Sequence, residues 1–67
     1  MAELLREHEL IVGQMFRVHW GNSKRGDHDI DGRYFGSSKE RGLIFDYRGD
    51  MVALPTRDFL GAELLDL

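Results

Sequence analysis

A chain of 67 residues with a net charge of −3 and no cysteine predicts one domain with a single small core. A chain near this size buries only about 60% of the surface that its unfolded form exposes. No disulfide can add stability, so we expect that homodimerisation could contribute. No apolar run approaches the roughly 20 residues of a membrane-spanning helix, and the N-terminus lacks the pattern of a secretory signal. We therefore expect a cytoplasmic protein in which residues 1–67 form one small domain.

The charge is distributed unevenly along the chain. Both ends are acidic, whereas the middle, from residue 13 to residue 48, is mildly basic. A dedicated nucleic-acid-binding domain usually has a basic composition with clustered Lys and Arg. The overall composition therefore lowers the expectation of nucleic-acid binding without removing it.

The first ten residues predict a short helix or a flexible arm that precedes the rest of the domain. Leu4, Leu5 and His8 have the spacing of one face of an amphipathic helix over residues 2–9. So short a helix is not stable in water unless it docks on another part of the protein.

A strand pattern begins at Ile11, where the apolar period changes to two. The side chains expected on its buried side are Val12, Phe16, Val18 and Trp20. Residues 21–32 are polar, flanked by glycine and without a period, so they predict a long loop. Residues 33–36 then predict a short strand and residues 37–42 a turn.

The last third of the chain predicts two strands, a helical turn and a terminal element. Residues 43–48 alternate as a strand, and a tight reversal at residues 49–50 leads into a further strand. The inward side chains of these two strands would be Leu43, Phe45, Tyr47, Val52 and Leu54. Pro55 ends the second strand because proline cannot donate to a sheet ladder. We expect one helical turn capped by Thr56 and a short strand or turn over residues 61–67.

This succession of elements resembles the small SH3-like barrel. The segment VALPTRDFLGAELL resembles the closing part of an SH3 domain, where a proline introduces the turn and an aromatic residue lies within it; here these are Pro55 and Phe59. A leading helix before five bent strands is equally similar to Sm-like barrels. The resemblance covers residues 12–67 as a pattern. It implies a mainly β fold, a small five-stranded SH3-like barrel over residues 11–67, with a short N-terminal helix and a helical turn before the last strand.

The octapeptide RGDHDIDG, residues 25–32, raises the question of a calcium site. Asp27, Asp29, Asp31 and Gly32 match positions 1, 3, 5 and 6 of an EF-hand loop, where alternate carboxylates converge on one ion. The glutamate expected at position 12 is Ser38 instead, and nearby basic residues would repel a cation. Calcium binding by these three aspartates is therefore a weak alternative, and we expect no metal site and no cofactor.

Nucleophiles and histidines show no catalytic pattern in the sequence. Ser37 and Ser38 lie in a polar turn, and His8, His19 and His28 are far apart without ligand spacing. We therefore expect no catalytic residues and no enzymatic activity.

Aromatic residues supply the leading functional prediction. A barrel this small cannot easily bury all of its Phe, Tyr and Trp side chains. We therefore expect Phe16, Phe45 and Phe59 inside, with Trp20, Tyr34 or Tyr47 partly exposed. Exposed aromatic side chains beside a charged loop form a surface that can grip a peptide. We predict a non-catalytic protein-binding module, either an adaptor or an inhibitor of a larger protein, whose partner has a basic segment. Its binding residues would be Trp20, Asp27, Asp29, Asp31, Tyr34 and Tyr47.

The alternative prediction is binding of RNA or DNA, as the similarity to Sm-like barrels implies. Aromatic side chains can stack on bases while basic side chains contact phosphates. The basic residues that would contact nucleic acid are Arg17, Lys24, Arg25, Arg33, Lys39 and Arg41.

Overall fold

A computed structural model describes residues 4–22 and 26–65 of the chain. These residues form five strands and two short 3-10 helical turns. In chain order the elements are η1 (Glu7–Glu9), β1 (Met15–Asn22), β2 (Gly26–Ser38), β3 (Gly42–Tyr47), β4 (Asp50–Leu54), η2 (Thr56–Asp58) and β5 (Phe59–Leu64). The prediction of a mainly β protein is confirmed. No helix in these two described ranges has the length and apolar character needed to cross a membrane.

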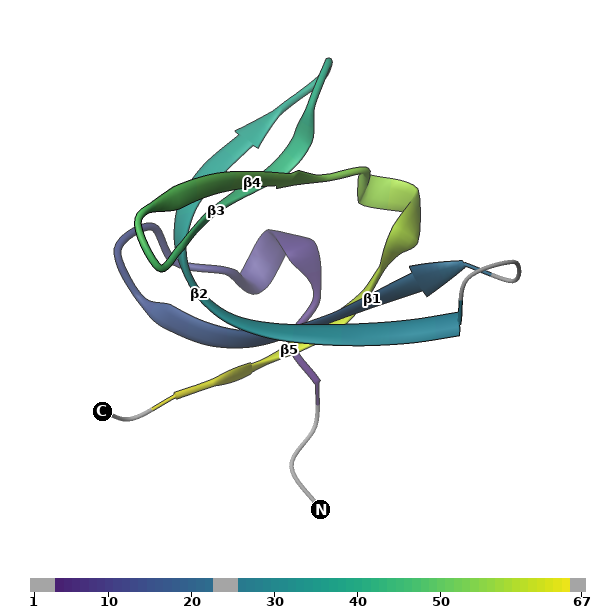
Figure 1. Cartoon of the computed structure of the whole chain (residues 1–67), viewed down its shortest axis with the longest axis horizontal. Helices are drawn as coiled ribbons and strands as arrows, with labels where there is room; N and C mark the ends of the chain where they lie inside the picture. The colour runs from purple at the N-terminus through teal and green to yellow at the C-terminus, as the bar shows by residue number, and fades with distance from the viewer. Residues whose placement is uncertain (1–3, 23–25, 66–67) are drawn as a thin grey trace.

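All five strands belong to one antiparallel sheet with the order β4-β3-β2-β1-β5. β2 pairs with β1 from Gly26 to Arg33 and with β3 from Arg33 to Ser38, so its two halves have different neighbours. Figure 1 shows that β2 bends between these neighbours and that the sheet curls around a central space. The sheet is strongly curved. It is not closed by strand pairing, because β4 and β5 are the two ends of the strand order.

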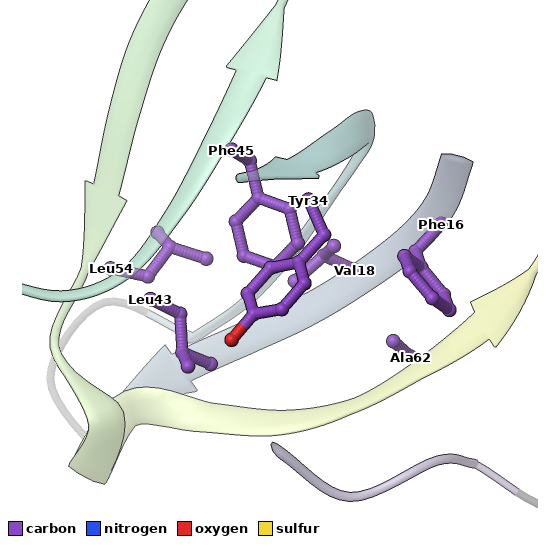
Figure 2. Packing of buried hydrophobic residues seen from close by; sticks show 7 residues of the cluster. All are labelled: Phe16, Val18, Tyr34, Leu43, Phe45, Leu54 and Ala62. Atoms are coloured by element: carbon purple, nitrogen blue, oxygen red, sulfur yellow. The ribbon is translucent and has the colours of Figure 1, made fainter. Parts of the chain in front are cut away.

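The core lies inside this curl and receives side chains from all five strands. Figure 2 shows the buried cluster, which consists of Phe16, Val18, Tyr34, Leu43, Phe45, Leu54 and Ala62. Val18 and Phe45 have no exposed surface, and Phe16 is 1% exposed. The expectation that Phe16 and Phe45 are inside is thus confirmed. Phe59, also expected inside, packs against the cluster but is only partly buried.

The predicted long loop over residues 21–32 is wrong. Residues from Gly26 onward already belong to β2, and Trp20 lies opposite His28 in the β1–β2 ladder. The three aspartates occupy alternate positions on the exposed side of the strand, whereas Ile30 is partly buried and Gly32 is buried. Their spacing is therefore the two-residue period of a half-buried strand.

Gly32 holds an inward position of β2 where a side chain has little room. A Cβ there would lie 3.2 Å from the carbonyl oxygen of Asp46 and 3.3 Å from the Cβ of Phe45. Because glycine leaves this core position without a side chain, the apolar half of the alternation is weak in the sequence. The strand is consequently hard to distinguish from a loop by composition alone.

The predicted N-terminal helix is also wrong within the described residues. The only helical residues before β1 in that part of the chain are the three of η1. Leu5 instead forms an isolated antiparallel bridge with Ala62 of β5, in which its N–H donates to the Ala62 oxygen at 2.7 Å. Pairing with a strand edge satisfies the backbone at Leu5, which an isolated short helix would leave largely to water.

Two boundaries differ from the sequence-based expectations. β1 begins at Met15, and Val12 lies in the preceding turn with 63% of its surface exposed, not on the buried side. The residue that precedes η2 is Pro55, and no side chain caps this turn, so Thr56 is not its cap. The predicted strands over residues 43–48 and 51–55, and the helical turn after them, are confirmed within one or two residues.

Candidate functional site

One concave feature of the described residues is a groove beside the single tryptophan of the chain. It has a volume of about 420 Å³ and is lined by Trp20, Gly21, His28, Ala53, Leu54, Pro55 and Asp58. We call this feature the Trp20 groove. Its wall comes from the far end of the β1–β2 hairpin on one side and from the end of β4 with η2 on the other.

Strand pairing builds the aromatic side of the Trp20 groove. Trp20 and His28 are opposite each other in the ladder, and their ring centroids lie 5.5 Å apart with an interplanar angle of 32°. Trp20 also lies opposite Phe59 of β5, next to a register shift between His19 and Trp20. The indole ring is therefore packed against the core on one side and reaches the groove on the other.

The opposite wall is set by the turn that follows β4. Pro55 ends the strand, and its carbonyl oxygen accepts a hydrogen bond of 2.9 Å from the N–H of Asp58. This bond closes η2 and brings Asp58 back to the groove that Pro55 and Leu54 also line. Proline at this place offers a rigid apolar surface and has no N–H that needs a partner.

Gly21, which lines the Trp20 groove, lies close to the carboxylate of its strand partner Asp27. A Cβ on Gly21 would lie 2.8 Å from Oδ1 of Asp27 and 2.5 Å from the carbonyl oxygen of Gly26. Gly21 thus allows the hairpin strands to approach closely and the Asp27 carboxylate to lie over its Cα. The Trp20 groove therefore combines an apolar surface with Asp58, whereas Asp27 is not among its lining residues.

The other two aspartates of β2 line a different hollow. This hollow, which we call the Arg17 hollow, has a volume of about 320 Å³ and is lined by Arg17, Asp29, Ile30, Asp31, Tyr47 and Arg48. The guanidinium carbon of Arg48 lies 5.3 Å from the centre of the Tyr47 ring, within cation–π range. The structure therefore does not bring Asp27, Asp29 and Asp31 to one site, as the sequence predicts.

Arg17 and Asp31 form the ion pair of this hollow, with 2.9 Å between Nε and Oδ1. The hydrogen bond from Arg17 lowers the pKa of the Asp31 carboxyl from its ordinary value. The same bond, followed by the attraction of the Asp31 charge, raises the pKa of Arg17. Asp31 is thus already partnered within the protein, which weakens its prediction as a partner-binding residue.

Tyr34 is not available as a binding residue. Its side chain is 6% exposed and lies between the rings of Phe16 and Phe45, at centroid distances of 6.5 Å and 5.4 Å. Figure 2 shows the ring inside the core cluster. The prediction of Tyr34 as a binding residue is wrong because the inward period of β2 places it in the core. Trp20 and Tyr47 are partly exposed, as expected for binding residues.

The basic residues predicted to contact nucleic acid are dispersed. Arg17 pairs with Asp31, and Nη1 of Arg33 donates to the carbonyl oxygen of Gly13 at 2.6 Å. Lys24 and Arg25 lie outside the described residues. Among the members of the predicted set that the structure describes, Lys39 and Arg41 lie together, at the β2–β3 turn.

These two residues face a third hollow, which we call the basic hollow. Its volume is about 350 Å³, and it is lined by Lys39, Glu40, Arg41, Gly42, Pro55, Thr56 and Arg57. Arg57 was not foreseen as part of any site. Its neighbours Pro55 and Asp58 were likewise not assigned to a site, because only the folded sheet brings η2 to the two hairpins.

No three acidic or histidine side chains of the described residues are arranged to hold a metal ion. The calcium alternative loses its geometric basis, because Asp27, Asp29 and Asp31 lie on a strand and Asp31 is bound to Arg17. Among the described side chains, Nε2 of His19 is a buried polar atom that has no hydrogen-bond partner.

No protein-family model matches the chain, and no curated protein and no solved structure matches it. The function is therefore inferred from the three hollows and their charges.

Proposed function

We propose that the protein is a non-catalytic protein-binding module and that the Trp20 groove takes an extended, basic segment of its partner. This proposal rests on one observation: the Trp20–His28 ring pair, Pro55 and Asp58 line the same groove. Ligand sites in proteins are typically concave and largely apolar, with a few polar groups that fix orientation. An adaptor, or an inhibitor of a larger protein, would use the groove in the same way.

The chemistry of the groove favours arginine or lysine in the ligand. A guanidinium or ammonium over the face of an exposed tryptophan gains about 0.5–1 kcal/mol from the ring. Asp58 lines the same groove and can pair with this cation. The apolar stem of the ligand side chain can lie against Pro55 while its charged end meets a carboxylate.

The order of the strands supports the SH3-like resemblance as a proposal about the fold. The order β4-β3-β2-β1-β5, with a 3-10 turn between β4 and β5, is compatible with a barrel in which the two ends of the sheet curl toward each other. Such a fold-level likeness raises the expectation of a binding module, but the function rests on the groove itself.

Short synthetic peptides test this proposal, with the fluorescence of Trp20 as the readout. We expect a Pro/Leu peptide with one Arg to change the emission in a saturable way, and its Arg→Gln counterpart to bind more weakly. Asp58→Asn should reduce the affinity for the Arg peptide, whereas Asp50→Asn, an exposed change outside the groove, should not. Equal binding of both peptides by the native protein and by Asp58→Asn would contradict the proposal.

Nucleic-acid binding stays a prediction, and the basic hollow is the feature that favours it. Phosphate contacts make such binding steeply salt-dependent. A titration with single-stranded RNA of mixed sequence at low and moderate salt tests it. Binding at low salt that Lys39→Gln with Arg41→Gln removes would support this alternative, and no binding at low salt would reject it.

A further inference from the structure

We infer that the Trp20 groove and the basic hollow form one charge-polarised binding surface. The ligand would be an extended peptide with a basic residue on the Trp20 side and an acidic residue on the side of the β2–β3 turn. This inference rests on the proposed function and specifies its ligand. Figure 1 shows the β2–β3 hairpin and η2 at the same side of the molecule, where β4 leads into η2.

Pro55 connects the two features because it lines both of them. The chain is fixed at this point by Leu54, whose side chain is in the core at 5% exposure. Gly42 packs directly on the backbone of this segment: a Cβ there would lie 3.0 Å from the N of Thr56, and even closer to the oxygen of Leu54. The β2–β3 turn and the start of η2 are therefore held against each other.

The two sides of Pro55 carry opposite charge. The Trp20 groove is lined by Asp58, with no Lys or Arg among its described lining residues. The basic hollow has Lys39, Arg41 and Arg57 against the single carboxylate of Glu40. Arg57 and Asp58 are adjacent in η2, yet they line different features, so this short turn separates the two charges.

The charges on the two sides are not paired with each other. The ion pair found among the described residues is Arg17 with Asp31, which lies in neither feature. The turn that carries Lys39 and Arg41 is itself ordered, since the N–H of Arg41 donates to Oγ of Ser38 at 2.9 Å. Opposite charges that no ion pair among the described residues joins complement a ligand with both charges. They repel a ligand that has a like charge at the wrong end.

An extended peptide fits this surface better than a nucleic acid does. A polyanion that contacts Lys39, Arg41 and Arg57 and continues across Pro55 would bring phosphates to the carboxylate of Asp58. A peptide can change the sign of its charge along its length, and each residue of an extended chain advances about 3.3 Å. The polarity of the surface would also fix the direction in which the peptide lies.

Four peptides of one length, with the same Pro/Leu middle, test the inference. Their end residues are Arg and Glu, Glu and Arg, Arg and Arg, or Gln and Gln, so that both directions are sampled. Binding is followed by Trp20 fluorescence and by amide chemical shifts of the labelled protein. We expect one of the two Arg/Glu peptides to bind about two- to fivefold more tightly than the Arg/Arg peptide, the effect expected of an exposed ion pair.

A charge-reversal variant sharpens the test. Arg41→Glu with Arg57→Glu should transfer the preference to the Arg/Arg peptide. Arg6→Glu with Arg48→Glu makes the same change of net charge at exposed positions outside both features and should leave the preference unchanged. Circular dichroism of both variants establishes that they remain folded.

The outcomes distinguish a failure of the charge-polarised surface from a failure of the proposed basic-peptide function. If the Arg/Arg peptide binds at least as tightly as both Arg/Glu peptides, the inference is overturned and the basic-peptide function stands. If no peptide changes the fluorescence or the shifts at millimolar concentration, both are overturned. Tighter binding of single-stranded RNA than of any peptide, with shifts at Lys39, Arg41 and Arg57, would also overturn the inference and favour nucleic acid.

Discussion

Arg17 and Asp31 lie directly opposite each other on β1 and β2 and form a two-bonded pair on the exposed side of the sheet. Nε donates to Oδ1 at 2.9 Å and Nη2 to Oδ2 at 3.3 Å. Their side chains remain 44% and 47% exposed, so water and salt screen the attraction. The pair helps to fix the register of the hairpin that carries Trp20 and His28.

This pair predicts a specific dependence of stability on pH. The pKa of Asp31 is lower in the folded protein than its ordinary value near 3.9, so the stabilisation is present above that value. It is lost as the pH falls through the folded pKa, because the protonated carboxyl no longer pairs with Arg17. We expect Asp31→Asn to lower the melting temperature at pH 7 and at low salt, and the difference from the native protein to vanish in acid.

Thermal melts from neutral to acidic pH, followed by circular dichroism, measure this difference. Asp50→Asn is the matched control, since Asp50 is exposed and lies in none of the ion pairs found among the described residues. A difference between Asp31→Asn and the native protein that grows toward acid would contradict the role given to the pair.

Alanine substitutions at two glycines with similar backbone angles, Gly42 and Gly49, distinguish the cost of steric contact from the cost of backbone strain. Gly42 and Gly49 have φ values of +85° and +88°, which disfavour an L side chain by about 1–2 kcal/mol. A Cβ on Gly49 would meet open space, whereas one on Gly42 would collide with the backbone of Leu54. We therefore expect Gly42→Ala to lower the free energy of unfolding well beyond Gly49→Ala, as measured by urea denaturation. Equal losses would show that the segment around Leu54 can move away.

The core predicts a large effect at Phe45. This side chain has no exposed surface and contacts the ring of Tyr34 in the centre of the cluster. Phe45→Ala should cost about 3–5 kcal/mol, which is comparable to the whole stability of so small a domain. Phe35→Ala, at a position 47% exposed, should change the stability by about 0.5 kcal/mol or less. Urea denaturation of both variants, beside the native protein, checks this difference.

The bridge between Leu5 and Ala62 can be tested through its backbone. Leu5→Pro removes the N–H that donates to the Ala62 oxygen, and Leu5→Ala removes only the apolar side chain. We expect Leu5→Pro to be less stable than Leu5→Ala by about 0.5–1.5 kcal/mol, the net contribution of one hydrogen bond. Amide hydrogen exchange at Ala62, whose N–H donates to the Leu5 oxygen at 3.1 Å, should be faster in Leu5→Pro. Equal stability and equal exchange would mean that the bridge contributes nothing.

Elements with a clear apolar period could be read from the sequence. Leu43, Phe45 and Leu54 belong to short apolar runs between strong turn signals, and all three are buried. The first half of β2 could not be recognised in this way. There the aspartates take the exposed positions and Gly32 takes a buried one, so the apolar half of the period is nearly absent. The alternate spacing of these aspartates also matches the first positions of a calcium-binding loop.

The candidate site was predicted only in its local parts. Trp20 was expected to be partly exposed because a small core cannot hold every aromatic side chain. Its association with Pro55 and Asp58 depends on contacts between segments that are distant in the sequence, which no local pattern reveals. Homodimerisation stays a prediction, which sedimentation velocity measurements over a range of concentrations would test.

The pairing of β1 with β5 has a consequence for how the chain folds. β1–β2, β2–β3 and β3–β4 are pairings of consecutive strands, whereas Val18 and Ala62 come together from opposite ends of the chain. Hairpins form in microseconds, but a contact between distant segments must first overcome the entropy of closing a long loop. We therefore expect the docking of β5 to be the slowest step of folding. Because the Trp20 groove needs both η2 and the β1–β2 hairpin, we expect the groove to form only at that step.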